Sequence, residues 1–417
     1  MSTFGYDPVP DASSMTDGAD GGRGGTGGTG GTGAGQGGAA AIGGSAGSTV
    51  GSGGSTAGAA GSSGGVGGKG GTGGSGGGTG GAGGKGGASG TADGGIPPID
   101  AGCAITCGSG PCPVRSGLPR VLVSRPFDQQ ITAIAVSADT LYFGTYPNQS
   151  DGAIYAMPLG GGVPTLLVGS GRIRELRLDG DTLYYVSEDG SGLSTAALRA
   201  VRTTGGLPLD IAQAPRIMDV LPMPAEIYFG KGGSGVPHQV VRTGRDGTGA
   251  RTVVSLFGTL WGFAVDDGNV YVADYDYGGL IVQRPLGGGS GGTLTTSPEP
   301  ITRPIIDGED IVFVQGVSTP DTCRSAVMSI PKSLGTPLQR ISPGTSGVDV
   351  MGLVRDDMFI YWSSTGVHGA VLRVQKGQTP EIIAAEQQSA SPPVLGPRDV
   401  YWIARAGSTY EVRTVPK

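Results

Sequence analysis

Three charged residues occupy equivalent positions in a pattern that this 417-residue chain repeats. Glu175, Asp219 and Arg303 each stand nine residues before the middle of an apolar or aromatic triplet. If neighbouring repeats are adjacent in space, the carboxylates of Glu175 and Asp219 can approach each other. Such a pair can bind Ca²⁺ or serve as general acid and base. The alternative is a water-filled channel that tolerates any polar side chain at these positions, in which case no cofactor is expected.

A second candidate group alternates carboxylates with aromatic rings. It consists of Asp274, Tyr275, Asp276 and Tyr277, with Trp261 in the same repeat. Aromatic faces and carboxylates together can bind a sugar, a cationic group or a metal ion. The simpler interpretation is the exposed tip of a hairpin. We take both groups as candidate ligand-binding residues.

Few other side chains suggest catalysis. His238 and His368 are the only histidines, and we expect both in loops between a second and a third strand of a repeat. Two isolated histidines are more often surface residues than catalytic groups. The chain contains no nucleophile elbow, no phosphate-binding loop and no metal-binding histidine pair. We therefore identify no catalytic residue, and an enzyme is the less favoured class.

The elements that position these candidates are seven similar units, each with an apolar stretch, a turn and a triplet. The triplets are Leu141-Tyr142-Phe143, Leu183-Tyr184-Tyr185, Ile227-Tyr228-Phe229, Val270-Tyr271-Val272, Ile311-Val312-Phe313, Ile360-Tyr361-Trp362 and Val400-Tyr401-Trp402. Successive middle residues are 42, 44, 43, 41, 49 and 40 positions apart. A period of this length with several short strands per unit is typical of a β-propeller. The sequence therefore predicts an all-β, seven-bladed β-propeller over residues 114–417.

Each unit is predicted to contain an innermost strand, a tight turn, the aromatic second strand and two further strands. Asp266 and Asp356 stand at the turn position, which Asp and Gly favour. The last unit ends after its third strand, Tyr410–Val415, whereas Ser116–Val123 has the pattern of an outer strand without a unit of its own. We expect this N-terminal strand to close the last blade, because closure removes open sheet edges.

The units resemble the YWTD-type and related extracellular propellers, in which an inner strand ending in Asp-Gly leads to an aromatic pair. Residues 263–274, Phe-Ala-Val-Asp-Asp-Gly-Asn-Val-Tyr-Val-Ala-Asp, are the nearest match. The resemblance covers residues 114–417 and implies the fold but no particular function. YWTD propellers have six blades, whereas seven units occur here. The whole layout is similar to bacterial cell-envelope proteins, and the Gly-Gly-Xaa tract is similar in composition to mycobacterial PGRS sequences.

The chain before the repeats has a different composition. Of the 86 glycines, 42 fall in residues 1–100, which contain almost no large apolar side chain between positions 21 and 95. Such a segment buries too little apolar surface to offset the entropy of ordering, so we predict a disordered tether. Residues 101–113 form a short junction that contains cysteines. The four cysteines are Cys103, Cys107, Cys112 and Cys323.

The cysteines favour disulfides in an oxidising compartment over free thiols, and their spacing fits a zinc site poorly. Four cysteines allow three pairings, so the connectivity stays open. The formal net charge is −6 and no basic cluster occurs, which argues against nucleic-acid binding. No apolar run is long enough for a transmembrane helix. The N-terminus lacks the features of a signal peptide, yet the tether favours an extracellular or cell-envelope location. An upstream start codon would reconcile the two.

These observations favour a non-enzymatic propeller, tethered to a surface or secreted, that binds a protein or a glycan as a monomer. One alternative is a propeller hydrolase or lyase that uses a metal near Glu175 and Asp219. Another is a structural component of the cell envelope. A bound ion in the channel would favour the enzyme, and a featureless channel with a busy rim would favour the binding module.

Overall fold

The structure is a computed structural model. It describes residues 106–107, 110–115, 117–147, 152–188, 195–233, 235–256, 258–275, 278–316, 325–333, 339–340, 350–365 and 369–417. The predicted tether over residues 1–100 lies outside the described residues. The described residues belong to one compact unit, Ser89–Lys417.

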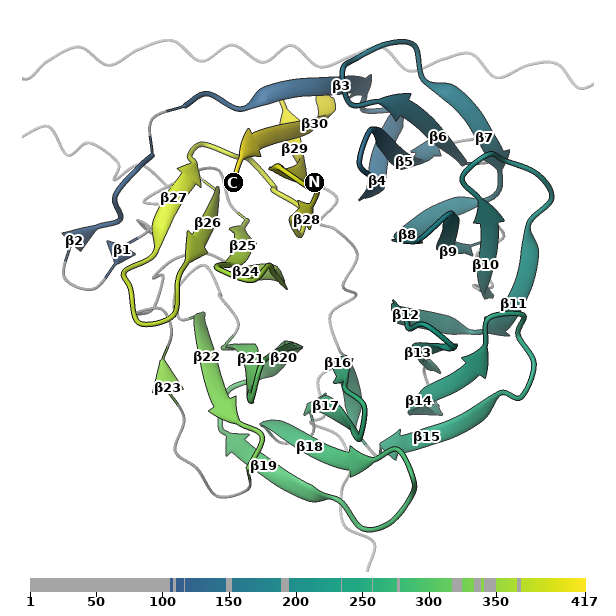
Figure 1. The fold of residues 1–417 in the computed structure, drawn as a ribbon, viewed down its shortest axis with the longest axis vertical. Helices are drawn as coiled ribbons and strands as arrows, with labels where there is room; N and C mark the ends of the chain where they lie inside the picture. Colours follow the sequence, from purple (N-terminus) through teal and green to yellow (C-terminus); the bar gives the residue numbers. More distant parts are fainter. Residues whose placement is uncertain are drawn as a thin grey trace, which may run out of the picture. The chain divides into compact units, whose positions relative to one another are not determined.

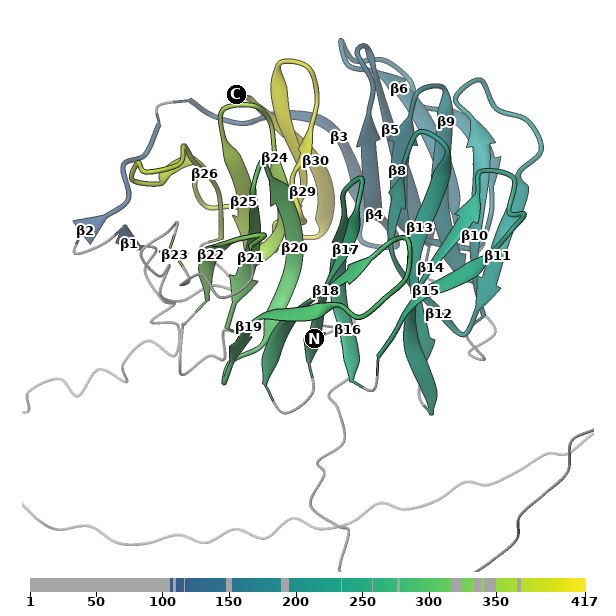
Figure 2. The same ribbon diagram turned by 60° about the horizontal axis from the view of Figure 1, so that its bottom comes forward.

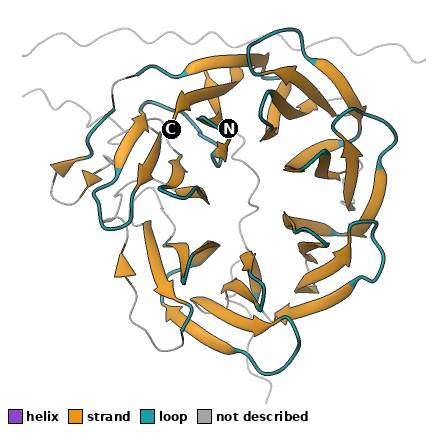
Figure 3. Ribbon diagram, viewed as in Figure 1, coloured by secondary structure: helices purple, strands orange, loops and turns teal. Residues whose placement is uncertain are grey.

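Seven four-stranded antiparallel sheets form a ring (Figure 1), and residues of the innermost strands line a central channel. Figure 3 shows strands joined by loops, and no described residue lies in a helix. The tilted view in Figure 2 shows the strands along their length, and they run through the depth of the ring. The predicted seven-bladed β-propeller is therefore confirmed. No helix in the described part of the chain is long and apolar enough to cross a membrane.

Within blades one to six, the strands run in chain order from the channel outward, and in blade seven the outermost strand is the N-terminal β3. Blades one to three are β4 (Gln129–Val136), β5 (Thr140–Pro147), β6 (Ala153–Pro158), β7 (Thr165–Gly169); β8 (Arg172–Asp179), β9 (Thr182–Glu188), β10 (Ala196–Arg202), β11 (Leu209–Ala214); and β12 (Arg216–Pro222), β13 (Glu226–Gly233), β14 (Val236–Gly244), β15 (Arg251–Leu256).

The remaining blades follow the same order. Blades four to six are β16 (Thr259–Val265), β17 (Asn269–Tyr275), β18 (Gly279–Pro285), β19 (Gly292–Ser297); β20 (Ile301–Asp307), β21 (Asp310–Gln315), β22 (Ala326–Pro331), β23 (Gln339–Arg340); and β24 (Val350–Arg355), β25 (Ile360–Ser364), β26 (Ala370–Val374), β27 (Glu381–Ala384). Blade seven is β28 (Val394–Leu395), β29 (Asp399–Ala406), β30 (Thr409–Pro416) and β3 (Arg120–Pro126), and a separate hairpin joins β1 (Thr106–Cys107) to β2 (Gly110–Pro111).

The N-terminal strand closes the ring as predicted. β3 pairs antiparallel with β30, with Arg120 opposite Thr414 and Pro126 opposite Thr409. The strand begins later than the predicted Ser116–Val123, directly after Pro119. The outer strands β7 and β11 also begin directly after a proline, Pro164 and Pro208. Proline has no N–H to donate to a ladder, which explains why each of the three strands starts directly after its proline.

Blade seven has a shorter innermost strand than the repeat predicts. β28 covers only Val394–Leu395, whereas the innermost strands of the other blades contain six to eight residues. Pro392 and Pro393 stand where ladder donors are needed, so regular pairing is lost there. The chain still follows β29, because the N–H of Ser391 donates to the carbonyl of Ile403 at 2.8 Å.

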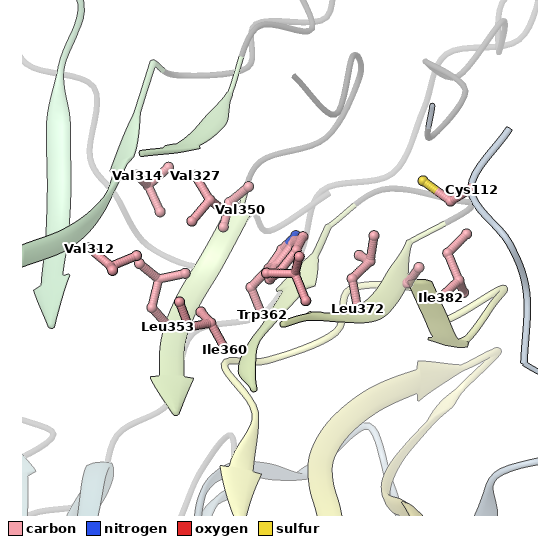
Figure 4. Packing of buried hydrophobic residues seen from close by; sticks show 12 residues of the cluster. Cys112, Val312, Val314, Val327, Val350, Leu353, Ile360, Trp362, Leu372 and Ile382 are labelled. Carbon is pink, nitrogen blue, oxygen red and sulfur yellow. The ribbon is translucent and has the colours of Figure 1, made fainter. Parts of the chain in front are cut away.

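The core lies between the faces of neighbouring blades. Figure 4 shows one part of it, where Trp362 packs among Val350, Leu353 and Leu372, and Cys112 lies near Ile382 at its edge. Trp362 is fully buried. The aromatic residues of the triplets thus fill the space between wedge-shaped sheets.

The junction is attached to the outside of blade six. The backbone N–H of Arg115 donates to the carbonyl of Ile382, and the N–H of Ile382 donates to the carbonyl of Pro113, both at 2.9 Å. Cys112 is buried and disulfide-bonded. The side chains of the other three cysteines lie outside the described residues.

Candidate functional site

The innermost strands carry bulges at nearly the same position. In six of the seven described blades, the register between innermost and second strand shifts two or three residues after the first pair. The residues at the shift are Thr132, Arg174, Asp219, Trp261 with Gly262, Arg303 with Pro304, and Gly352. A bulge bends its strand and redirects a side chain. The result is a ring of bulges at the end of the channel where each innermost strand begins.

A cavity of about 670 Å³ lies inside this ring. It is lined by residues from the innermost strand of every blade, including Glu175, Asp219 and Arg303. All three charged residues that the repeat singled out therefore do face the channel. Much of the remaining wall is apolar, with Leu176, Leu221 and other aliphatic side chains.

Glu175 is fixed by groups of its own and the next blade. Its Oε1 accepts a hydrogen bond from the backbone N–H of Val220 at 3.0 Å and pairs with Nη2 of Arg177 at 2.9 Å. The side chain is only 17% exposed. Burial raises the pKa of Glu175, the charge of Arg177 opposes this rise, and the nearby charge of Asp219 adds to it. The charge of Asp219 therefore acts on the carboxyl group of Glu175, and a metal-binding or catalytic role of the pair stays a prediction.

Asp219 and Arg303 have an uncommon backbone conformation. Their φ angles are 44° and 55°, in the left-handed region that side chains with a Cβ rarely adopt. The Arg303 guanidinium approaches the sulfur of Met351 at 3.9 Å. Among the described residues, no carboxylate pairs with Arg303, and no group donates a hydrogen bond to the carboxylate of Asp219. Both charges are thus available at the channel wall.

Gly262 explains how these two residues come close. A Cβ added to Gly262 would lie 3.2 Å from Oδ2 of Asp219 and 3.1 Å from the backbone nitrogen of Arg303. Its φ of +129° also excludes most other residues. The bulges of blades three, four and five therefore meet at Gly262, with Asp219 on one side and Arg303 on the other.

The aromatic candidates lie at the same end of the channel. The rings of Trp261 and Tyr275 are 5.6 Å apart at an interplanar angle of 61°. Thr259, at the start of β16, pairs with Tyr275, at the end of β17. Tyr275 is 37% exposed whereas Asp274 is 8% exposed. The expected loop from Asp274 starts later, because Asp274 and Tyr275 continue the ladder of β17.

Other predicted residues are placed as follows. Asp276, Tyr277 and His368 lie outside the described residues. The prediction that His238 lies in a loop is wrong, because His238 lies in β14, where it pairs with Leu256. Burial lowers the pKa of His238, and the charge of Arg216 lowers it further. A half-buried histidine within a ladder serves the fold, since Gly232 leaves the space for its ring.

The described residues contain no group of three His, Cys, Asp or Glu side chains placed to hold a metal ion. One oxygen of Glu175 is already used by Arg177 and Val220. Arg177 was not among the predicted residues. Residues two apart on a strand share a face, so the spacing of Glu175 and Arg177 could have indicated their pairing. The bulges left no signal beyond glycine at two of the positions.

No protein-family profile matches this chain, and no curated protein sequence matches it. Among solved structures, a puromycin-hydrolysing peptidase from Mycobacterium tuberculosis is similar, with a TM-score of 0.54 and 12% identity over 72% of this chain. This chain spans 54% of that peptidase. The β-propeller domain of the Trilobed protease from Pyrococcus furiosus has a TM-score of 0.53 and 10% identity, over 69% of this chain and 95% of that domain. At such identities the likeness concerns the propeller fold.

Proposed function

We propose that this chain is a non-enzymatic binding module whose ligand, a protein or a glycan, enters the channel at the ring of bulges. The strongest support comes from the position, backbone conformation and lack of ion-pair partners of Asp219 and Arg303 among the described residues. Both line the cavity, both have positive φ angles, and neither has an ion-pair partner among the described residues. Strained residues of this kind persist when the surrounding structure enforces them, and they cluster at ligand sites.

The aromatic pair supports the same site. Trp261 belongs to the bulge of blade four, and Tyr275 exposes part of its ring beside it. Aromatic rings at the edge of a cavity offer large contact areas with little conformational freedom to lose. The proposed site therefore combines Asp219 and Arg303 in the channel with Trp261 and Tyr275 at its rim.

We further propose a monomeric extracellular or cell-envelope protein, with residues 1–100 as a tether. The disulfide of Cys112 supports an oxidising compartment. The glycine content of residues 1–100 supports a segment that holds the propeller away from an attachment point.

A second candidate function is a hydrolase or lyase. The observation that favours it is Glu175, since burial raises its pKa and a carboxyl group with a raised pKa can act as a general acid. Glu175 would then donate the proton to the leaving group. Consumption of a bound ligand by the wild-type chain, but not by Glu175→Gln, would establish it.

The binding function is tested with the full chain against panels of soluble glycans and of short peptides, with the melting temperature as readout. A ligand that binds the native state stabilises it by about 2.7 kcal/mol at a concentration of 100 Kd. We expect a shift with at least one panel, lost in the double variant Asp219→Asn, Arg303→Asn. Asp181→Asn is the control, because Asp181 is exposed and pairs with Arg202 in blade two. No shift with any ligand would contradict the proposal.

A further inference from the structure

Some charged side chains of the cavity wall have an ion-pair partner and others have none among the described residues. Glu175 is paired with Arg177. Arg174, which also lines the cavity, is paired with Glu188 at 2.7 Å. These pairs leave two charged groups of the cavity wall without a charged partner among the described residues, the Asp219 carboxylate and the Arg303 guanidinium.

These two groups have opposite signs and do not reach each other. Asp219 lies beside Gly262, and its charge is close enough to the carboxyl group of Glu175 to raise the pKa of that group. The Arg303 side chain extends to blade six, where its guanidinium contacts the Met351 sulfur. A thioether is a weak acceptor, so a carboxylate can replace it at little cost. The wall thus presents an acceptor for a cation at blade three and a donor for an anion at blades five and six.

Resting on the proposed binding function, we propose that the ligand is a peptide segment that carries both a cationic and an anionic side chain. Asp219 would bind the ammonium or guanidinium group, and Arg303 would bind the carboxylate. The apolar wall between them, which includes Leu221, Phe263 and Ile305, would contact the backbone and aliphatic parts of the peptide.

Other ligands suit the wall less well. The hydroxyl groups of a neutral glycan can hydrogen-bond to both charged groups, but they bring no opposite charge, and such bonds are weaker than those between two charged groups. An anion alone would satisfy Arg303 and be repelled by Asp219. A ligand that carries both charges forms a charge-assisted hydrogen bond with each group. The same arrangement of charges in the site disfavours ligands that place their charges in the reversed positions.

The test uses the full chain and the capped peptides acetyl-Lys-(Gly)n-Glu-amide, with n from 0 to 3, together with versions in which Gln replaces Lys or Glu. Trp261 reports binding through its fluorescence, because Trp362 and Trp402 are fully buried. We expect at least one doubly charged peptide to bind at least tenfold more tightly than both of its Gln versions. Raising the salt concentration should weaken this binding.

The variants assign each charge. Asp219→Asn should remove the preference for Lys over Gln and keep the preference for Glu over Gln, and Arg303→Asn should do the reverse. Asn tolerates a positive φ, and circular dichroism verifies that each variant folds. Asp219→Gly is the second variant at this position. Asp181→Asn should change neither preference.

Three results would overturn the inference. If the charged peptides and their Gln versions bind equally, the charges are not used. If a neutral glycan raises the melting temperature and no peptide binds, this inference fails while the binding function stands. If neither peptides nor glycans bind, both proposals fail.

Discussion

The two ends of the innermost strands treat charged residues in opposite ways. At the turn end, Asp266 accepts hydrogen bonds from the backbone of Gly268 and Asn269 and from the Tyr271 hydroxyl, and it pairs with Lys332 of the next blade at 2.9 Å. At the bulge end, no described group donates a hydrogen bond to the carboxylate of Asp219. Among the described residues, an aspartate carboxylate thus accepts several hydrogen bonds at the turn end and none at the bulge end.

The arrangement at the turn end recurs in the ring. Asp356 accepts hydrogen bonds from the backbone of Met358 and Phe359 and from the Tyr361 hydroxyl, and it pairs with Lys417 of blade seven at 3.3 Å. Each such aspartate folds a turn and joins two blades at once. The difference teaches that the aspartates at the turn end stabilise the ring, whereas Asp219 and Arg303 at the bulge end, unlike Glu175, have no charged partner among the described residues and contribute little to it.

The largest effect is expected at the turn end. Asp266→Ala should lower the free energy of unfolding by about 2–3 kcal/mol, because two backbone donors, a buried hydroxyl and Lys332 lose their acceptor. Asp267→Ala is the matched control, since Asp267 is exposed and should change stability by about 0.5 kcal/mol or less. Urea unfolding measures both. Equal effects of the two substitutions would remove the contrast between structural and open carboxylates.

The pH dependence of stability should have opposite signs at the two ends. Burial raises the pKa of Asp266, but hydrogen bonds from Lys332 and the backbone outweigh it, and the net pKa is lowered from 3.8. Its contribution is present above that value and is lost as pH falls through the lowered pKa. The pKa of Glu175 is raised from 4.5, chiefly by burial. Its contribution is present below 4.5 and is lost as pH rises through the raised pKa.

Urea unfolding between pH 3 and pH 7 separates these two contributions. Glu175→Gln should be more stable than wild type at pH 7 and similar to it at pH 3. Asp266→Asn should be less stable at pH 7 and approach wild type at the acid limit. If both variants change with pH in the same direction, the two carboxyl groups are not in the different environments described here.

The smallest effect is expected at the bulge end. Arg303→Asn should leave stability unchanged or raise it by up to about 1 kcal/mol, because Asn tolerates a positive φ better than Arg. Arg251→Asn is the control, since Arg251 begins the edge strand β15 and has no positive φ. A loss of more than about 1 kcal/mol in Arg303→Asn, measured by urea unfolding, would show that this arginine serves the fold.

Most of the fold follows from the sequence because the repeat is written in the residues that build it. The triplets supply the core between blades, and Asp266 and Asp356 form the turns that their position predicts. Ring closure was readable because the last unit lacks an outer strand that the N-terminal segment supplies. The boundaries were less readable, since Pro119 and Pro392 shift the start of pairing without changing the apolar pattern.

The candidate site was predictable only in part. The spacing placed Glu175, Asp219 and Arg303 on the channel wall, because a position of the repeat maps to a position in every blade. The partners were not predictable, since pairing depends on the bulges, which the two-residue period of a strand does not encode. Glu175 forms an ion pair with Arg177, whereas Asp219 has no positively charged partner among the described residues.

The attachment of the junction has a mechanical consequence. Arg115 hydrogen-bonds through its backbone to Ile382 of blade six and through its guanidinium to the carbonyl of Pro416 in blade seven. A pulling force that is transmitted to Pro113 therefore loads these bonds before it loads β3. The strand β3 then resists along its length, with its ladder to β30 sheared rather than opened one bond at a time. The segment at Arg115 thus acts as a strain relief for the strand that keeps the ring closed.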